Sequence, residues 1–206
     1  MNALADRKVG ELINKHFIAS FQRVGSFKIA GKKKQGGNVA TYFCAADGRV
    51  LGAIAGPVDA KTMRDEVEWT IQKTRQAIKD SKGNADKFKA LLRQAHAQRL
   101  RDKYGARVTP ILKDQAGQSL ETALAYRDKD GRKLAPVLSL PPIENKSEVR
   151  ALSNLAKTHQ LLAAHAGAKI EQLYGAVFEG ILNEKVTTKP VQVKTPFPWQ
   201  REVKTR

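Results

Sequence analysis

Apolar positions between residues 38 and 63 alternate with turn residues in a way that predicts a hairpin followed by a helix. The runs 39–43 and 50–55 are rich in β-branched, aromatic and small apolar residues, and an Asp-Gly pair at 47–48 separates them. Such a pair between two apolar runs is the strongest short signal for a β-hairpin. Asp59 is then placed to cap a helix whose apolar residues recur every three or four positions up to residue 78.

A second pattern covers residues 148–185, where apolar or small residues recur at alternating spacings of three and four. This period predicts one long helix with a heptad seam. Gly167 and Gly175 fall off the seam, where they are expected to weaken or bend the helix without opening its packed face. The seam consists of Val149, Leu152, Ala156, His159, Ala163, Ala166, Ile170, Leu173, Val177 and Gly180. We expect the seam to pack either along the helices of residues 59–104 or against a second copy, which would make a homodimer through residues 149–180. His159 is then a polar residue that fixes the helix register.

The remaining segments complete a division of the chain into three parts. Residues 1–82 hold a helix at 5–15, a strand at 17–24, and the hairpin with its helix. Residues 83–186 form a mainly helical region with a helix at 85–104 and a hairpin at 120–140. Residues 187–206 contain three prolines and alternating charges, which predict an extended basic tail.

The helix before residue 17 and the later strand, Asp-Gly turn, strand and helix resemble the second half of a thioredoxin-like domain. The resemblance covers residues 5–80 and rests on residues 9–18 and 38–63. It implies an α/β fold: an incomplete thioredoxin-like domain followed by a mostly helical region with a long C-terminal helix.

The resemblance does not extend to the redox chemistry of thioredoxins. That chemistry needs two thiols at Cys-x-x-Cys spacing, and Cys44 is the only cysteine of the chain. Residues 35–39 also contain no proline where the family has a cis-proline. We therefore expect a protein that is not an enzyme, in which Cys44 is a buried and inert thiol. A thiol activity of Cys44 is the alternative.

Only residues 1–4 stand where the family has its first strand. The strand at residues 39–44 then has an open edge, and an unpaired edge must be covered. The candidates are residues 25–31, residues 133–140, or a strand from a second molecule.

The charge of the chain is its strongest compositional feature. Its 37 lysines and arginines exceed its 20 aspartates and glutamates, which gives a net charge of +17. A field of this sign attracts acidic proteins and nucleic acid, although it also serves as a solubilising surface. No window has the about 18–20 apolar residues of a membrane span. No export signal is recognisable in the first twenty residues, and the single cysteine suits a reducing compartment, so we expect a cytoplasmic protein.

Two basic groups are candidate anion-binding or partner-binding sites, with a solvated surface as the alternative for each. Lys32, Lys33 and Lys34 lie in a glycine-rich segment that forms a loop or a short extra strand. The other group is Lys89, Arg93 and Lys103, which fall with His96 on one flank of the helix at 85–104, with Arg99 nearby. No histidine or cysteine pair has zinc-ligand spacing, so neither a metal nor a cofactor is expected.

The most direct functional prediction is a non-catalytic binding or scaffolding protein with an acidic partner. The alternative is a nucleic-acid-binding protein, in which residues 32–34 and the helix face at 89–103 converge on one surface. In the tail, Phe197 and Trp199 stand between prolines and are candidates for docking, either on a partner or on the chain itself.

Overall fold

The computed structural model describes residues 3–21, 38–112, 138–147, 149, 151–184 and 186, together with the backbone of five short strands. It is a mixed α/β structure, as the sequence predicts. In the part of the chain that is described, no helix is both long and apolar enough to cross a membrane. The elements are η1 (Ala3–Ala5), α1 (Arg7–His16), β1 (Phe27–Ala30), β2 (Lys33–Gly36), β3 (Ala40–Cys44), β4 (Val50–Ala55), α2 (Ala60–Ser81), α3 (Ala85–Tyr104), β5 (Tyr126–Arg127), β6 (Lys133–Leu134), α5 (Asn154–His165), α6 (Ile170–Gly175), the π-helix η2 (Ala176–Ile181) and β7 (Gln192–Lys194).

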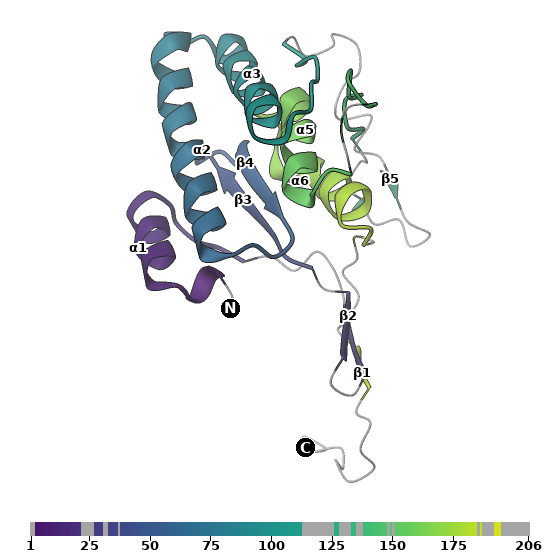
Figure 1. Ribbon diagram of the computed structural model, residues 1–206. Helices are drawn as coiled ribbons and strands as arrows, with labels where there is room; N and C mark the ends of the chain where they lie inside the picture. The colour runs from purple at the N-terminus through teal and green to yellow at the C-terminus, as the bar shows by residue number, and fades with distance from the viewer. Residues whose placement is uncertain are drawn as a thin grey trace.

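Strands β3 and β4 form the antiparallel hairpin that the sequence predicts. Thr41 lies opposite Ile54, and the turn between the strands places Gly48 at a φ of 80°, a conformation that favours glycine. Every residue of β4 is buried. The reason is that α2 packs on this strand and α5 packs on it as well, so that the hairpin is enclosed between helices (Figure 1).

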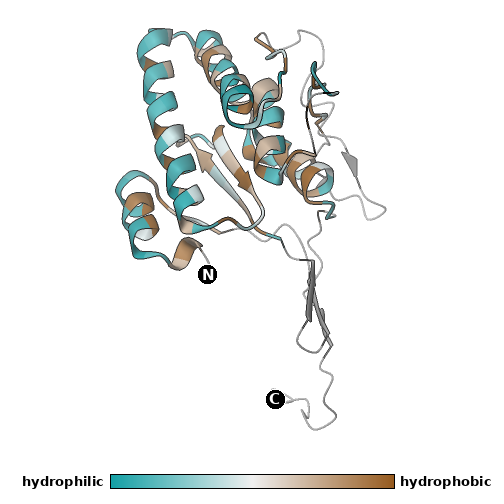
Figure 2. Ribbon diagram, in the orientation of Figure 1, coloured by the Kyte–Doolittle hydropathy of each residue, from teal (hydrophilic) through white to brown (hydrophobic). Residues whose placement is uncertain are grey.

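Polar caps define where the main helices begin. Asp6, Asp59, Asn84 and Ser153 each accept a hydrogen bond from the backbone N–H three residues further on. These bonds satisfy donors that the first helical turn leaves without a partner. The cap at Asp59 was predicted from the sequence. Figure 2 shows hydrophilic residues along much of α2 and α3, and hydrophobic residues on the hairpin that these helices cover.

The single long helix predicted for residues 148–185 is wrong. Helix α5 ends at His165, α6 begins at Ile170, and the chain continues as the π-helix η2. Residues 166–169 leave the helical path to bond with the start of β4: Gly167 N donates to Val50 O at 2.8 Å, and Val50 N donates to Ala168 O at 2.8 Å. The hydrophobic period of the sequence cannot predict this pairing, because the pairing is made by backbone groups.

The heptad seam is nevertheless buried over much of its length, and it is covered by this chain itself. Helix α5 packs against α3, one of the two helical partners predicted within the chain, and also against β4. Ala156 and Ala163 have no exposed surface. Most residues of α5 off the seam are buried too, among them Leu161 and Leu162. A helix that is apolar all round belongs in a core, so the seam gives no support to the predicted homodimer.

Three of the short strands form a separate sheet with the order β2-β1-β7. Strand β1 is antiparallel to β2 and parallel to β7, and β6 is antiparallel to β5. The prediction that residues 25–31 or 133–140 cover the edge of β3 is therefore wrong for the residues described in these two segments. The basic segment was predicted to form a loop or a short extra strand, and Lys33–Gly36 forms a strand. The β5–β6 pair is shorter than the hairpin predicted at 120–140.

Residues on both sides of position 82 share one hydrophobic cluster. It contains Val50 and Ala77 from the first part of the chain, and Leu92, Leu161 and Leu173 from the second. This cluster therefore joins segments that are about a hundred residues apart in sequence.

Candidate functional site

A chain of buried polar groups crosses the centre of the structure, and each group comes from a different element. Nε2 of His96 on α3 lies 2.9 Å from the carbonyl oxygen of Leu51 on β4. Nδ1 of His96 lies 2.9 Å from Nδ1 of His159 on α5, and Nε2 of His159 lies 3.1 Å from Oε2 of Glu66 on α2. We call these four groups the polar chain. The polar chain connects β4, α3 and α5 to the Glu66 carboxylate on α2.

The Glu66 carboxylate ends the polar chain and is also the centre of a charge cluster. Its second oxygen accepts hydrogen bonds from Arg99 Nη2 at 2.7 Å and from Lys103 Nζ at 2.9 Å. Burial alone would raise the pKa of Glu66, which is only 2% exposed. The bonds from His159, Lys103 and Arg99 outweigh burial and hold this pKa well below its usual range. Glu66 is therefore a carboxylate at neutral pH.

Aromatic rings enclose the two imidazoles of the polar chain. The Trp69 ring stands edge-on to both, with centroids 4.9 Å from His96 and 5.2 Å from His159. The guanidinium carbon of Arg99 lies 5.1 Å from the centroid of Trp69, within the range of a cation–π contact. Tyr104 lies on the other side of His159, at 6.2 Å between ring centroids. These rings keep water from the imidazoles.

The enclosure favours the neutral form of both histidines. Burial lowers the pKa of His96 to about 3, and the neighbouring His159 acts in the same direction. Burial also lowers the pKa of His159, although the hydrogen bond and charge of Glu66 act against this shift. His96 and His159 are 1% and 2% exposed, so neither ring can touch a substrate in this conformation. The chemistry open to the polar chain is hydrogen bonding and the uptake of protons.

Of the polar chain, His159 was predicted from the sequence as a polar residue that fixes the register of the helical seam. His96 was predicted on the basic flank of α3, which is wrong because only 1% of His96 is exposed, and Glu66 was not predicted. Signals for Glu66 and His96 were present, because each replaces an apolar residue in a helical stripe: Glu66 lies between Met63 and Thr70, and His96 stands midway between two buried leucines. The pairing of these three helices is a long-range property, and no local pattern contains it.

The predicted basic flank of α3 does not form a common surface. The Arg93 side chain points into the protein, where it donates to Ala166 O at 3.2 Å and to Ile111 O at 2.9 Å. Only 4% of Arg93 is exposed, so the prediction that it meets an anion is wrong for this conformation. Lys103 binds Glu66, and the stem of Lys89 lies against Gly167. All three side chains have contacts within the fold.

The other candidate residues are in different positions. Lys33 and Lys34 lie in β2, described by its backbone alone, while Lys32, Phe197 and Trp199 lie outside the described residues. Binding of an anion by the three lysines, and docking of the tail, stay predictions. Cys44 is partly buried at the end of β3, and burial raises the pKa of its thiol to about 11, with smaller effects of Glu171 and Asp47. The thiol is therefore protonated at neutral pH and a poor nucleophile.

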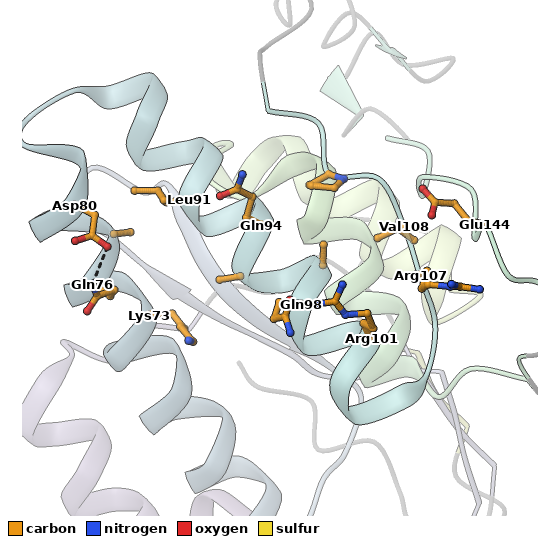
Figure 3. A pocket seen from close by; sticks show the side chains of 14 residues that line it. Lys73, Gln76, Asp80, Leu91, Gln94, Gln98, Arg101, Arg107, Val108 and Glu144 are labelled. Atoms are coloured by element: carbon orange, nitrogen blue, oxygen red, sulfur yellow. Dashed lines mark hydrogen bonds between the residues drawn. The ribbon is translucent and has the colours of Figure 1, made fainter.

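A groove of about 530 Å³ lies on the outer side of α2 and α3. Figure 3 shows the side chains that surround it, from both helices and from the segment that follows α3. We call it the α2–α3 groove. Its lining is Lys73, Gln76, Ala77 and Asp80 of α2, Leu91, Gln94, Ala95, Ala97, Gln98 and Arg101 of α3, and Arg107, Val108, Pro110 and Glu144.

The groove combines apolar side chains from both helices and the segment after α3 with amide, cationic and acidic groups. Both carboxylates in the lining are hydrogen-bonded within the protein. Asp80 accepts from Gln76 Nε2 at 2.7 Å, and Glu144 accepts from the Thr109 hydroxyl. The three cationic side chains at the groove are Lys73, Arg101 and Arg107, from three different segments. The arrangement suits a polar ligand that carries negative charge.

Comparison of the chain with family models, with curated proteins and with solved structures finds no match. Any functional proposal therefore rests on the two sites described above and on the sequence.

Proposed function

We propose that the chain is a non-catalytic binding protein and that an acidic protein segment docks in the α2–α3 groove. The observation that carries the proposal is the convergence of Lys73, Arg101 and Arg107 on one groove. A net charge of +17 adds a long-range attraction for the same class of partner.

The amides at the groove favour an extended peptide as the ligand. Gln76, Gln94 and Gln98 are exposed on adjacent turns of the two helices. Each amide has two N–H donors and an oxygen that can accept two hydrogen bonds. Gln76 and Gln98 use part of this capacity within the protein, on Asp80, Asp102 and Arg101. A peptide backbone presents alternating N–H and C=O groups, which match such amides. Acidic side chains of the same peptide would meet the flanking cations.

Nucleic acid is a weaker fit to this groove. Proteins that bind single strands stack the bases on aromatic rings, and none of the groove residues named above has such a ring. The predicted basic flank of α3, on which the nucleic-acid alternative relied, has its arginine inside the protein. We therefore favour an acidic protein over a nucleic acid.

The thioredoxin-like assignment belongs to the same proposal. It is supported by the order of α1, the β3–β4 hairpin and α2. The strand that the resemblance implies directly after α1, predicted at 17–24, does not form in the described residues 17–21. In this proposal the fold serves as a scaffold, and the helices that follow the hairpin supply the binding surface.

A binding assay with matched ligands tests the proposal. The ligands are a fluorescent peptide of alternating glutamate and glycine, and duplex DNA of equal net charge. Lys73, Arg101 and Arg107 are replaced together by glutamine. An exposed ion pair contributes about 0.2–1 kcal/mol, so we expect the triple variant to bind the peptide about tenfold more weakly. The matched control replaces Lys8, Lys15 and Lys61, which are exposed and lie outside the groove.

The control separates local binding from a general effect of charge, because it removes the same number of cations. Equal losses of affinity in both variants would show that only the net charge attracts the peptide. Tighter binding of DNA than of peptide, with the groove variant unchanged for both ligands, would contradict the proposal.

A further inference from the structure

The polar chain has one hydrogen position more than its neutral groups can fill. Three contacts join its four groups: Leu51 O to His96, His96 to His159, and His159 to Glu66. Each contact needs one hydrogen to be a hydrogen bond. Two neutral imidazoles bring one N–H each, and the Glu66 carboxylate brings none.

The carbonyl end fixes the position of one of these two hydrogens. Leu51 O can only accept, so the hydrogen of neutral His96 is on Nε2, and its Nδ1 is an acceptor. The hydrogen of neutral His159 can fill only one of the two other contacts: on Nδ1 it bonds to His96, and on Nε2 it bonds to the Glu66 carboxylate. In either tautomer, two acceptors face each other across the remaining contact.

We propose that the polar chain takes up a single proton on His159, and that this proton completes the hydrogen bonds that join α5 to α2 and α3, as a pH-sensitive device of the fold. With both ring nitrogens protonated, His159 donates from each, and all three contacts become hydrogen bonds. A second proton has no place. On Nδ1 of His96 it would set two donors face to face at 2.9 Å.

The charged groups around His159 determine the pH of this step. From α2 it faces the Glu66 carboxylate, which favours the proton. From α3 it faces His96, Tyr104 and the cations of Arg99 and Lys103, and both cations oppose the proton. From β4 the polar chain receives only the carbonyl of Leu51. Burial adds to the effect of the cations, so uptake is expected below the usual histidine pKa of about 6.5.

Nuclear magnetic resonance of the full chain with ¹⁵N-labelled histidine rings tests the proposal without any substitution. Spectra are recorded from about pH 8 to about pH 4.5, a range that includes the usual histidine pKa. His159 should change from one protonated ring nitrogen to two in a single step. His96 should keep its hydrogen on Nε2 throughout. Titration of His96 in this range, or a His159 ring that does not change, would overturn the proposal.

Glu66→Gln gives a second test. The side-chain amide can donate to Nε2 of His159, and it supplies the missing hydrogen without a proton from solvent. We expect the His159 step to disappear from this pH range. Glu68→Gln is the matched control, because it removes an exposed carboxylate from the same helix and should leave the step in place. A His159 step that persists in Glu66→Gln would also overturn the proposal.

Discussion

Glu66, His96 and His159 each occupy a helix position at which an apolar residue would face the core. Buried polar groups are costly unless they are hydrogen-bonded, and here each of the three side chains has partners on at least two other elements. Removal of one partner would leave the others buried and unsatisfied. These residues therefore favour a single packing of the helices, because the shift of one helix would break the hydrogen bonds between the three side chains.

The folded-state pKa of His96 predicts that acid destabilises the protein. This pKa is about 3. The unfolded chain binds a proton near the usual pKa of about 6.5. Between these values the unfolded state holds a proton that the folded state lacks, so the free energy of unfolding falls as the pH decreases through this window. The contribution is fully present above about pH 6.5.

Urea unfolding at several pH values between about 7.5 and 5 measures this effect. In His96→Gln the slope of the unfolding free energy against pH should be smaller, by up to about 1.4 kcal/mol per pH unit. Parallel curves for the two proteins would show that folding does not lower the pKa of His96.

A second prediction at the residue scale concerns Gly52 in β4. A Cβ atom at this position would lie 2.5 Å from Oγ1 of Thr70, so alanine would push α2 away from the strand. We expect Gly52→Ala to lower the free energy of unfolding by about 1–3 kcal/mol. A Thr70→Ala change in the same protein should recover part of the loss.

Gly10→Ala is the contrasting control. Gly10 lies inside α1 with nothing within 4 Å of the added atom, so alanine should stabilise the helix by about 0.5–1 kcal/mol. Equal effects of the two alanines in thermal unfolding would show that β4 and α2 are not as close as described.

At the scale of elements, the break between α5 and α6 completes the edge of β4. Gly167 and Ala168 exchange backbone hydrogen bonds with Val50, and Ile170 N donates to Gly48 O at 3.0 Å. The Arg93 guanidinium holds the start of this segment through Ala166 O. A strand edge is a site of association with other chains, and here a helical connection covers the edge at the first residue of β4 and at the turn before it.

Gly167 is the residue on which this connection depends most. Its φ of 84° is in the left-handed region, and an added Cβ would lie 2.9 Å from Cγ of Lys89. We expect Gly167→Ala to lower the free energy of unfolding by about 1–3 kcal/mol. Gly83→Ala separates the effect of the positive φ from that of the contact with Lys89, because Gly83 has a φ of 83° and no atom lies within 4 Å of an added Cβ. A loss no larger at Gly167 than at Gly83 would show that the contact with Lys89 contributes nothing.

At the scale of the whole molecule, the predicted dimer seam is used inside one chain. Leu173 has no exposed surface and belongs to the main hydrophobic cluster. With this surface already covered, we expect sedimentation of the wild-type chain to show a monomer.

Leu173→Asp tests whether the seam is buried within one chain or in a dimer interface. A charge at a fully buried site should lower the free energy of unfolding by several kcal/mol, about 3 or more, without changing the sedimentation of the remaining folded protein. Ile78→Asp is the surface control, because 59% of Ile78 is exposed, and its effect should stay within about 0.5 kcal/mol. A wild-type dimer that Leu173→Asp converts to a stable monomer would contradict the in-chain packing.

The sequence predicted those elements whose signals are local. The β3–β4 hairpin depends on its Asp-Gly turn, and α2 depends on the cap at Asp59; both were placed correctly. The break at Gly167 was missed because its cause is a backbone contact with Val50, which lies more than a hundred residues earlier. The polar chain was missed for the same reason, since its members belong to four separate elements.

The central position of α5 has a consequence for synthesis on the ribosome. Helices α1–α3 and the hairpin are complete by residue 104, and α2 already packs on β4. The rest of the cover of β4 comes from α5 and from the segment after it. A nascent chain of that length has its elements but lacks the helix that fills its core, and contacts so distant in sequence slow the final collapse. We therefore expect protease to cleave arrested nascent chains readily until α5 and its connection to α6 have left the exit tunnel.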